Sequence, residues 1–197
     1  MIRQYLPKNY WGVMAMSDSE DQVSTLRAGA HPVRLRILSL LTGAELSAAE
    51  IARELDLTHA NASYHLRVLA SAGMVVEAGE ERIRGGVAKR YRHPWEHKTV
   101  SSKERPTDPA ERELYVRAMA EELVRRSRLR SPGTPTALTD AELWVTPEVW
   151  QRVWDLVEEA STLLHAEAKP ARTEGTIHVN MTAGMFQMAD PQEGDAR

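Results

Sequence analysis

Residues 46–76 read LSAAEIARELDLTHANASYHLRVLASAGMVV, and this stretch decides the fold. Ser47 and Glu50 have the spacing of a capping box, in which each side chain binds a free backbone amide of the other residue. This spacing predicts a short helix that ends near Leu55. After a brief turn, Thr58 is placed to cap a second helix. The stretch therefore predicts a helix, a turn and another helix.

The second predicted helix has a buried stripe of Ala62, Leu66 and Leu69. Side chains off this stripe are available to a DNA groove, and none of them is acidic. Together with the capping residue they form the candidate reading set: Thr58, His59, Asn61, Ser63, Tyr64 and Arg67. The Asn61 amide can pair with adenine, and Arg67 is long enough to reach a phosphate.

Regular patterns also flank this core stretch. Apolar residues recur at steps of three and four over residues 23–41, which predicts a helix with a kink or a fresh start at Pro32. On the other side, an apolar run is followed by the glycines Gly79, Gly85 and Gly86. We read residues 74–92 as a two-stranded hairpin.

The segments HPVRLRIL (31–38), 46–76 and GGVAKRYRH (85–93) together closely resemble the ArsR-like winged helix-turn-helix regulators of bacteria. The resemblance covers about residues 23–94. It implies that residues 58–72 enter the major groove and that residues 78–89 form a wing near the DNA backbone. The basic residues expected to contact DNA in or beside this wing are Arg84, Lys89 and Arg90.

The net charge of −3 is unevenly distributed along the chain. Residues 21–95 carry a net charge of +2, whereas residues 96–197 carry −5. No acid lies between Leu57 and Val76, or between Arg82 and Trp95. These two stretches are therefore the ones expected to face phosphates.

Several other classes of function are disfavoured by the sequence. Because cysteine is absent, thiolate metal sites and the family's cysteine-containing sensor are excluded. Asp155, Glu158, Glu159 and His165 are the remaining metal candidates, and helix-surface acids are usually only solvated. We expect no metal, no cofactor, no catalytic residues and no enzyme activity. Without a signal peptide or a spanning segment, we expect a cytoplasmic protein with no membrane contact.

The pattern of the second half of the chain predicts two long helices. One begins at Asp108 and Pro109, and the other begins at Thr146 and Pro147. The second helix is expected to turn its apolar stripe inward: Val149, Val153, Leu156, Val157, Ala160, Leu163 and Leu164. Residues 141–145 and 176–181 are read as short strands that pair with each other. This half is expected to hold a homodimer together, to form an internal core, or to enclose a small apolar effector. The candidate pocket residues are Trp144, Trp150, Trp154, Met181 and Phe186.

The expected fold class is mainly α with a small β component (α+β). The expected division is an N-terminal extension (1–20), a winged helix-turn-helix domain (21–97), a linker (98–107), a dimerisation and effector domain (108–189) and a tail (190–197). The expected function is that of a sequence-specific transcriptional regulator, a repressor that binds double-stranded DNA as a homodimer. The alternatives are a winged-helix module for protein contacts alone, and a repressor that answers a small molecule without metal.

Overall fold

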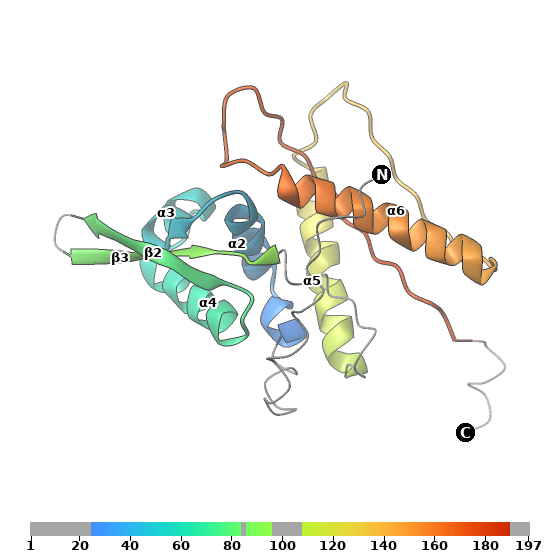
Figure 1. Cartoon of the computed structure of the whole chain (residues 1–197), viewed down its shortest axis with the longest axis horizontal. Helices are drawn as coiled ribbons and strands as arrows, with labels where there is room; N and C mark the ends of the chain where they lie inside the picture. The colour runs from blue at the N-terminus through green and yellow to red at the C-terminus, as the bar shows by residue number, and fades with distance from the viewer. Residues whose placement is uncertain (1–24, 84–85, 96–107, 190–197) are drawn as a thin grey trace, which may run out of the picture.

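The computed structural model describes residues 25–83, 86–95 and 108–189 (Figure 1). A helical head that carries a β-hairpin is followed by two long helices. The elements are α2 (Pro32–Gly43), β1 (Leu46–Ser47), α3 (Ala48–Leu55), α4 (His59–Ser71), β2 (Val76–Ile83), β3 (Gly86–Arg92), α5 (Pro109–Ser127) and α6 (Pro147–Ala166). This arrangement confirms the expected α+β class.

The helix α2 makes a fresh start at Pro32. Residues 25–29 form a separate helical segment, and the chain leaves the helical conformation before His31. His31 is the N-cap of α2, and its Nδ1 accepts a hydrogen bond of 3.1 Å from the Val33 amide. Pro32 fits the next position because it has no amide hydrogen that needs a partner.

The capping box predicted for α3 is confirmed. The backbone amide of Ser47 donates to Glu50 Oε2 at 2.7 Å, and the Glu50 amide donates to Ser47 Oγ at 3.4 Å. The helix ends at Asp56, whose backbone is left-handed with φ of 54°. This conformation turns the chain sharply toward Thr58, whose hydroxyl oxygen caps α4 by accepting from the Asn61 amide at 3.2 Å.

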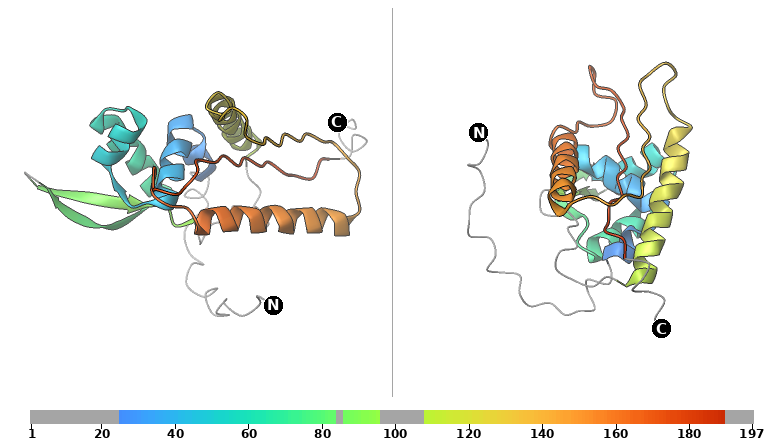
Figure 2. Two further views of the ribbon diagram at one scale, coloured as in Figure 1. Left: turned by 90° about the horizontal axis from the view of Figure 1, so that it is seen from above. Right: turned by 90° about the vertical axis from the view of Figure 1, so that its right-hand side faces the viewer.

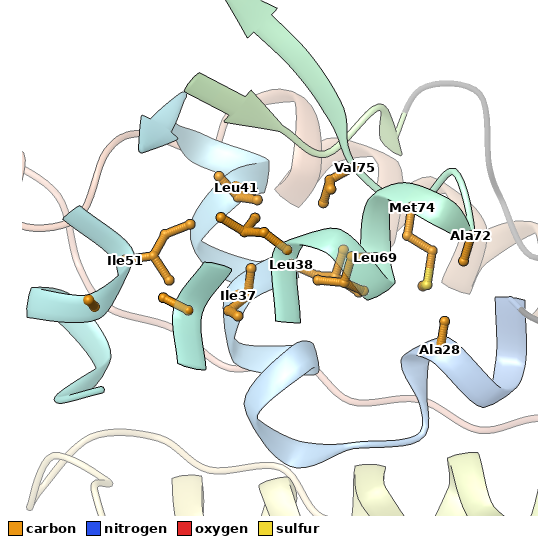
Figure 3. Close-up of a cluster of buried hydrophobic side chains, with 12 residues drawn as sticks. Ala28, Ile37, Leu38, Leu41, Ile51, Leu69, Ala72, Met74 and Val75 are labelled. Carbon is orange, nitrogen blue, oxygen red and sulfur yellow. The ribbon is translucent and has the colours of Figure 1, made fainter. Parts of the chain in front are cut away.

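The core of the head lies between α2, α3, α4 and the start of β2 (Figure 3). The predicted stripe of α4 is buried, since Ala62, Leu66 and Leu69 are at most 1% exposed. The other large, fully buried side chains come from α2, α3 and the turn that precedes β2: Ile37, Leu41, Ile51 and Val75. Three helices and the turn before β2 thus share one apolar core, which fixes the orientation of α4 relative to the rest of the head.

The sheet has three antiparallel strands in the order β1-β3-β2. The hairpin predicted from the glycine pattern is confirmed, with Val76 opposite Arg92 and Ile83 opposite Gly86. The short strand β1 was not predicted, and it pairs Leu46 with Tyr91. The far end of the hairpin projects beyond the helices of the head, as a wing does (Figures 1 and 2).

The helix α5 packs beside α2 and the segment that precedes it. Its Tyr115 ring lies so close to Gly29 that a Cβ at Gly29 would come within 2.5 Å of it. Ala118 of α5 is buried. Glu122 is also buried, and its carboxylate forms ion pairs with Arg125 and Arg126 of the same helix. The first long helix is therefore attached to the head.

Two expectations for the second half were wrong. Residues 141–145 and 176–181 are extended but are not strands, because no backbone ladder joins them. The stripe of α6 does not point inward, since α6 has no buried residue and its Leu156 is 56% exposed. The periodicity correctly predicted an amphipathic helix, but the described residues bury none of the side chains on its apolar face.

Candidate nucleic-acid interface

The face of α4 opposite the core carries the candidate reading set. His59, Asn61, Tyr64 and Arg67 are exposed, and Ser63 is half-buried. No acidic residue occurs anywhere in α4. Because the helix N-terminus carries a partial positive charge, the first turn with His59 and Asn61 favours a negatively charged partner.

Thr58 has a structural role in the same turn. Its side-chain oxygen accepts a hydrogen bond from the Asn61 backbone amide and so closes the first turn of α4. That bond orients Asn61 but engages one acceptor site of the Thr58 hydroxyl. We therefore assign Thr58 first to helix capping, and its predicted DNA contact depends on the remaining hydrogen-bonding capacity of the hydroxyl.

The exposed side of α4 is slightly hollowed. Tyr64, Arg67, Val68 and Ser71 line an open, shallow depression. Arg67 forms no ion pair with any residue that the structure describes. Its guanidinium is therefore available to a phosphate or to a base edge.

The wing cations that the sequence singled out are placed on β3, but they are paired. Lys89 Nζ lies 2.7 Å from Glu77 Oε1. Arg90 Nη1 lies 2.5 Å from Glu81 Oε2 and 3.3 Å from Glu50 Oε2. Arg84 lies outside the described residues.

Two of the acids that pair with these cations, Glu77 and Glu81, come from β2, the third, Glu50, comes from α3, and the sequence analysis missed these pairings. Lys89 is directly opposite Glu80 in the ladder, and Glu77 and Glu81 lie nearby on the same strand. The acid-free run from Arg82 to Trp95 covers β3 but only the last two residues of β2. The signal that reveals the acids is the hairpin register, because cross-strand neighbours, not sequence neighbours, set the local charge.

Behind the reading face, two histidine rings meet. The ring centroids of His31 and His65 are 4.9 Å apart. His65 Nδ1 is buried and has no hydrogen-bond partner among the described residues. Burial lowers the pKa of both histidines, and the nearby Arg34 lowers each of them further. This pair joins α4 to the N-cap of α2.

The candidate effector residues lie in the second half and are mostly open to solvent. Trp150 and Trp154 pack edge to face, with ring centroids 6.2 Å apart. Trp144 is 87% exposed and Phe186 is 68% exposed, while Met181 is partly covered. Within one chain, the described residues bring together only the two tryptophans of α6, and the effector pocket stays a prediction.

The four metal candidates of α6 have other contacts. Asp155 accepts a hydrogen bond from Gln151, and His165 Nδ1 lies 2.7 Å from the Ser161 carbonyl oxygen. In the described part of the chain, no three histidine or carboxylate side chains gather in a way that would hold a metal ion.

A comparison with protein families matches residues 30–78 to a helix-turn-helix domain. The match begins just after the first helical segment and runs through α2, α3 and α4 into β2. No curated protein matches the chain. No helix in the described ranges has the length and apolar character that crossing a bilayer requires. The chain thus carries a helix-turn-helix domain with a wing, which indicates a DNA-binding regulator.

Proposed function

We propose that this protein is a sequence-specific transcriptional repressor of the ArsR-like type that binds a two-fold DNA site as a homodimer. It works without a metal and catalyses no reaction. The helix α4 reads base edges in the major groove, and the wing lies along the phosphate backbone.

The acid-free exposed face of α4 carries this proposal. The core contacts of Ala62, Leu66 and Leu69 hold the helix from one side, so Asn61 and Arg67 project from a rigid base. Amide and guanidinium groups are the side chains that read adenine and guanine edges with two hydrogen bonds. A solvated helix surface would have no reason to avoid acids over its whole length.

The uncovered face of α6 supports the homodimer. Val149, Val153 and Leu156 are each at least 40% exposed on one helix. With 20 residues, α6 is about 30 Å long. A face of this length supplies much of the roughly 800 Å² per partner that a standard interface buries. Two heads on a two-fold site also double the few contacts that one head can make.

One observation favours the alternative in which the winged helix contacts only proteins. Lys89 and Arg90 are both neutralised by glutamates within the hairpin. A wing with paired cations attracts phosphates less strongly than the sequence suggested. The acid-free α4 lies outside this network, and for that reason we favour the DNA-binding function.

A response to a small apolar molecule is a second alternative, supported by the aromatic pair of Trp150 and Trp154. A ligand that binds between these rings and a partner surface would act through α6. Quenching of tryptophan fluorescence by apolar compounds tests this idea, with Trp154→Leu as the variant that should lose the response.

Selection of bound fragments from genomic DNA by the purified protein tests the main proposal. We expect recovery of fragments that share a two-fold symmetric sequence. Transcription in vitro from a promoter that overlaps this sequence should fall when the protein is added. Recovery of no shared sequence would favour the protein-contact alternative, and an increase in transcription would contradict the repressor assignment.

A further inference from the structure

The segment that follows α6 is fixed to the head by an ion pair. Arg172 Nη1 lies 2.8 Å and 2.9 Å from the two carboxylate oxygens of Glu54 on α3. The backbone of Arg172 is left-handed, with φ of 65°, which is an unfavourable conformation for a residue with a Cβ. The segment after α6 thus has an unfavourable backbone conformation at Arg172, the residue that contacts α3.

A second contact in this segment is a close approach of two backbones. At Gly43, the last residue of α2, a Cβ would lie 2.5 Å from the Lys169 carbonyl oxygen. No side chain fits in this space, so the absence of a Cβ allows residue 169 to lie directly against the end of α2. This contact fixes the position of the segment more tightly than an exposed ion pair does.

A third contact joins the end of α6 itself to the head. The Trp95 ring, which follows β3, lies 5.6 Å from the His165 ring, centroid to centroid. Figure 2 shows the C-terminal end of α6 beside the head and its N-terminal end pointing away. Among the described residues, the close contacts of the head with this part of the chain therefore lie at the C-terminal end of α6, in residues 165–172.

Along the rest of α6, the described residues form no comparable close approach, ion pair or ring contact with the head. The helix has no buried residue. Arg126 Nη1 of α5 donates to Asn180 Oδ1 at 3.1 Å. Asn180 lies in the chain after α6, so this bond does not hold the helix itself. The angle between α6 and the head is consequently set where residues 165–172 meet Gly43, Glu54 and Trp95.

We propose that residues 165–172 are a positioning latch that fixes the separation of the two α4 helices in the dimer, and so selects the spacing between DNA half-sites. This inference rests on the proposed function, since it takes α6 as the dimer contact and α4 as the reader. Half-sites on one face of DNA lie about 34–36 Å apart. If the head could tilt relative to α6, the dimer would also bind DNA in which the spacing between half-sites is one base pair longer or shorter.

Gly43→Ala is the sharpest variant for a test of the latch. Position 43 is not left-handed, and alanine is a better helix former than glycine, so α2 itself tolerates the change. The new methyl group would push Lys169 away from the head. Gly184→Ala is the matched control, because a Cβ at Gly184 meets nothing within 4 Å.

The ion pair permits a charge-exchange test. Glu54→Arg and Arg172→Glu each place like charges together at the latch, whereas the double variant restores an ion pair of reversed direction. We expect each single variant to loosen the choice of spacing and the double variant to regain it. General damage to folding would not be repaired by the second substitution.

The experiment uses DNA from the fragment selection, with the spacing between half-sites changed by one or two base pairs. For the wild type and Gly184→Ala, we expect affinity to fall at least about tenfold at the wrong spacing, the order of the penalty for one mismatched base pair. For Gly43→Ala, we expect a loss of threefold or less. Equal discrimination by all three proteins would overturn the latch.

A distance measurement gives a second readout that does not depend on DNA. Because the chain has no cysteine, Ala70→Cys on the exposed side of α4 places one spin label on each head. Electron–electron distances in the dimer should be narrowly distributed in wild type and broad with Gly43→Ala. A distribution for Gly43→Ala that is as narrow as that of wild type would overturn the latch but not the dimer. Absence of dipolar coupling in wild type would contradict the dimer, and with it both proposals.

Discussion

Lys89 Nζ and Glu77 Oε1 are 2.7 Å apart across the wing hairpin, and both side chains are about half exposed. The hydrogen bond and the charge of Glu77 raise the pKa of Lys89, so the lysine is charged at neutral pH. Its charge is nevertheless balanced by the Glu77 carboxylate. A DNA phosphate that approaches Lys89 is repelled by this carboxylate and has to take its place. The glutamates of β2 therefore control how strongly the wing attracts phosphates.

Glu77→Gln should strengthen DNA binding without changing sequence preference. The variant releases Lys89 for a phosphate contact, which we expect to steepen the dependence of log affinity on log salt by about one unit per half-site. Fluorescence anisotropy over a salt series, with a selected duplex and a scrambled duplex, measures this slope. Asp140→Asn removes an equal charge from an exposed loop and is the control. An equal effect of both variants would mean that only net charge matters.

Asn61→Ala and Arg67→Ala should weaken DNA binding in different ways. If Asn61 pairs with adenine, its loss should cost about 1–3 kcal/mol on the selected site and leave the salt slope unchanged. Loss of Arg67, as a phosphate contact, should weaken both duplexes and lower the slope by about one unit per half-site. Anisotropy with both duplexes distinguishes these results. An equal loss on both duplexes with Asn61→Ala would remove Asn61 from the reading set.

Ser47→Ala should destabilise the head by about 1 kcal/mol, because it removes the N-cap of α3. Glu50 would also lose a hydrogen bond of 2.8 Å from the serine hydroxyl. Urea unfolding measures the change in the free energy of unfolding. The control is Ser71→Ala, because the Ser71 hydroxyl is exposed and bonds only to a carbonyl oxygen of its own helix. A change below about 0.5 kcal/mol in both variants is the ordinary result for a surface position and would refute the capping role.

The parts of the fold that could be predicted depend on neighbours in sequence. The capping box of Ser47 and Glu50 and the stripe of Ala62, Leu66 and Leu69 involve residues three to seven positions apart, so one helix determines them. The candidate reading set follows from that stripe by exclusion. For this reason the sequence located the exposed side of α4 without knowledge of the rest of the chain.

The features that could not be predicted depend on distant partners. The pairing of Leu46 with Tyr91 joins residues 45 positions apart, and no local signal marks a two-residue strand. Likewise, the charge of the wing depended on a register that places Glu80 opposite Lys89. Periodicity identified the apolar stripe of α6 but not what covers it, since an inward stripe and a dimer stripe have the same spacing.

The free energy of unfolding should fall as the pH drops below about 6.5, in part because of His65 and His31. Burial lowers the pKa of both, and Arg34 also lowers both, whereas Glu121 acts in the opposite direction on His31. The unfolded chain therefore binds more protons than the folded chain just below pH 6.5. The stability that this effect provides is complete above that pH and is lost as the pH falls toward the folded pKa.

His65→Leu tests this origin of the pH dependence. It removes a buried nitrogen that has no partner among the described residues. Between pH 8 and pH 5.5, urea unfolding of the variant should show a weaker loss of stability than wild type, by at most about 1.4 kcal/mol per pH unit for one proton. His59→Gln, an exposed histidine on the same helix, should behave as wild type does. A parallel pH profile for His65→Leu would exclude His65 as a contributor.

Leu156→Glu should convert a dimer into a monomer while the head stays folded. Leu156 is 56% exposed on α6, so within a single chain the glutamate meets water and costs little, whereas in a dimer it would bury an unpaired charge. Light scattering should give about twice 22.1 kDa for wild type and 22.1 kDa for the variant. Ile83→Glu is the matched control, since Ile83 is 53% exposed on the wing, away from α6. If both variants remain dimeric, another surface holds the protomers, and if wild type is a monomer at micromolar concentration, the two-fold site loses its basis.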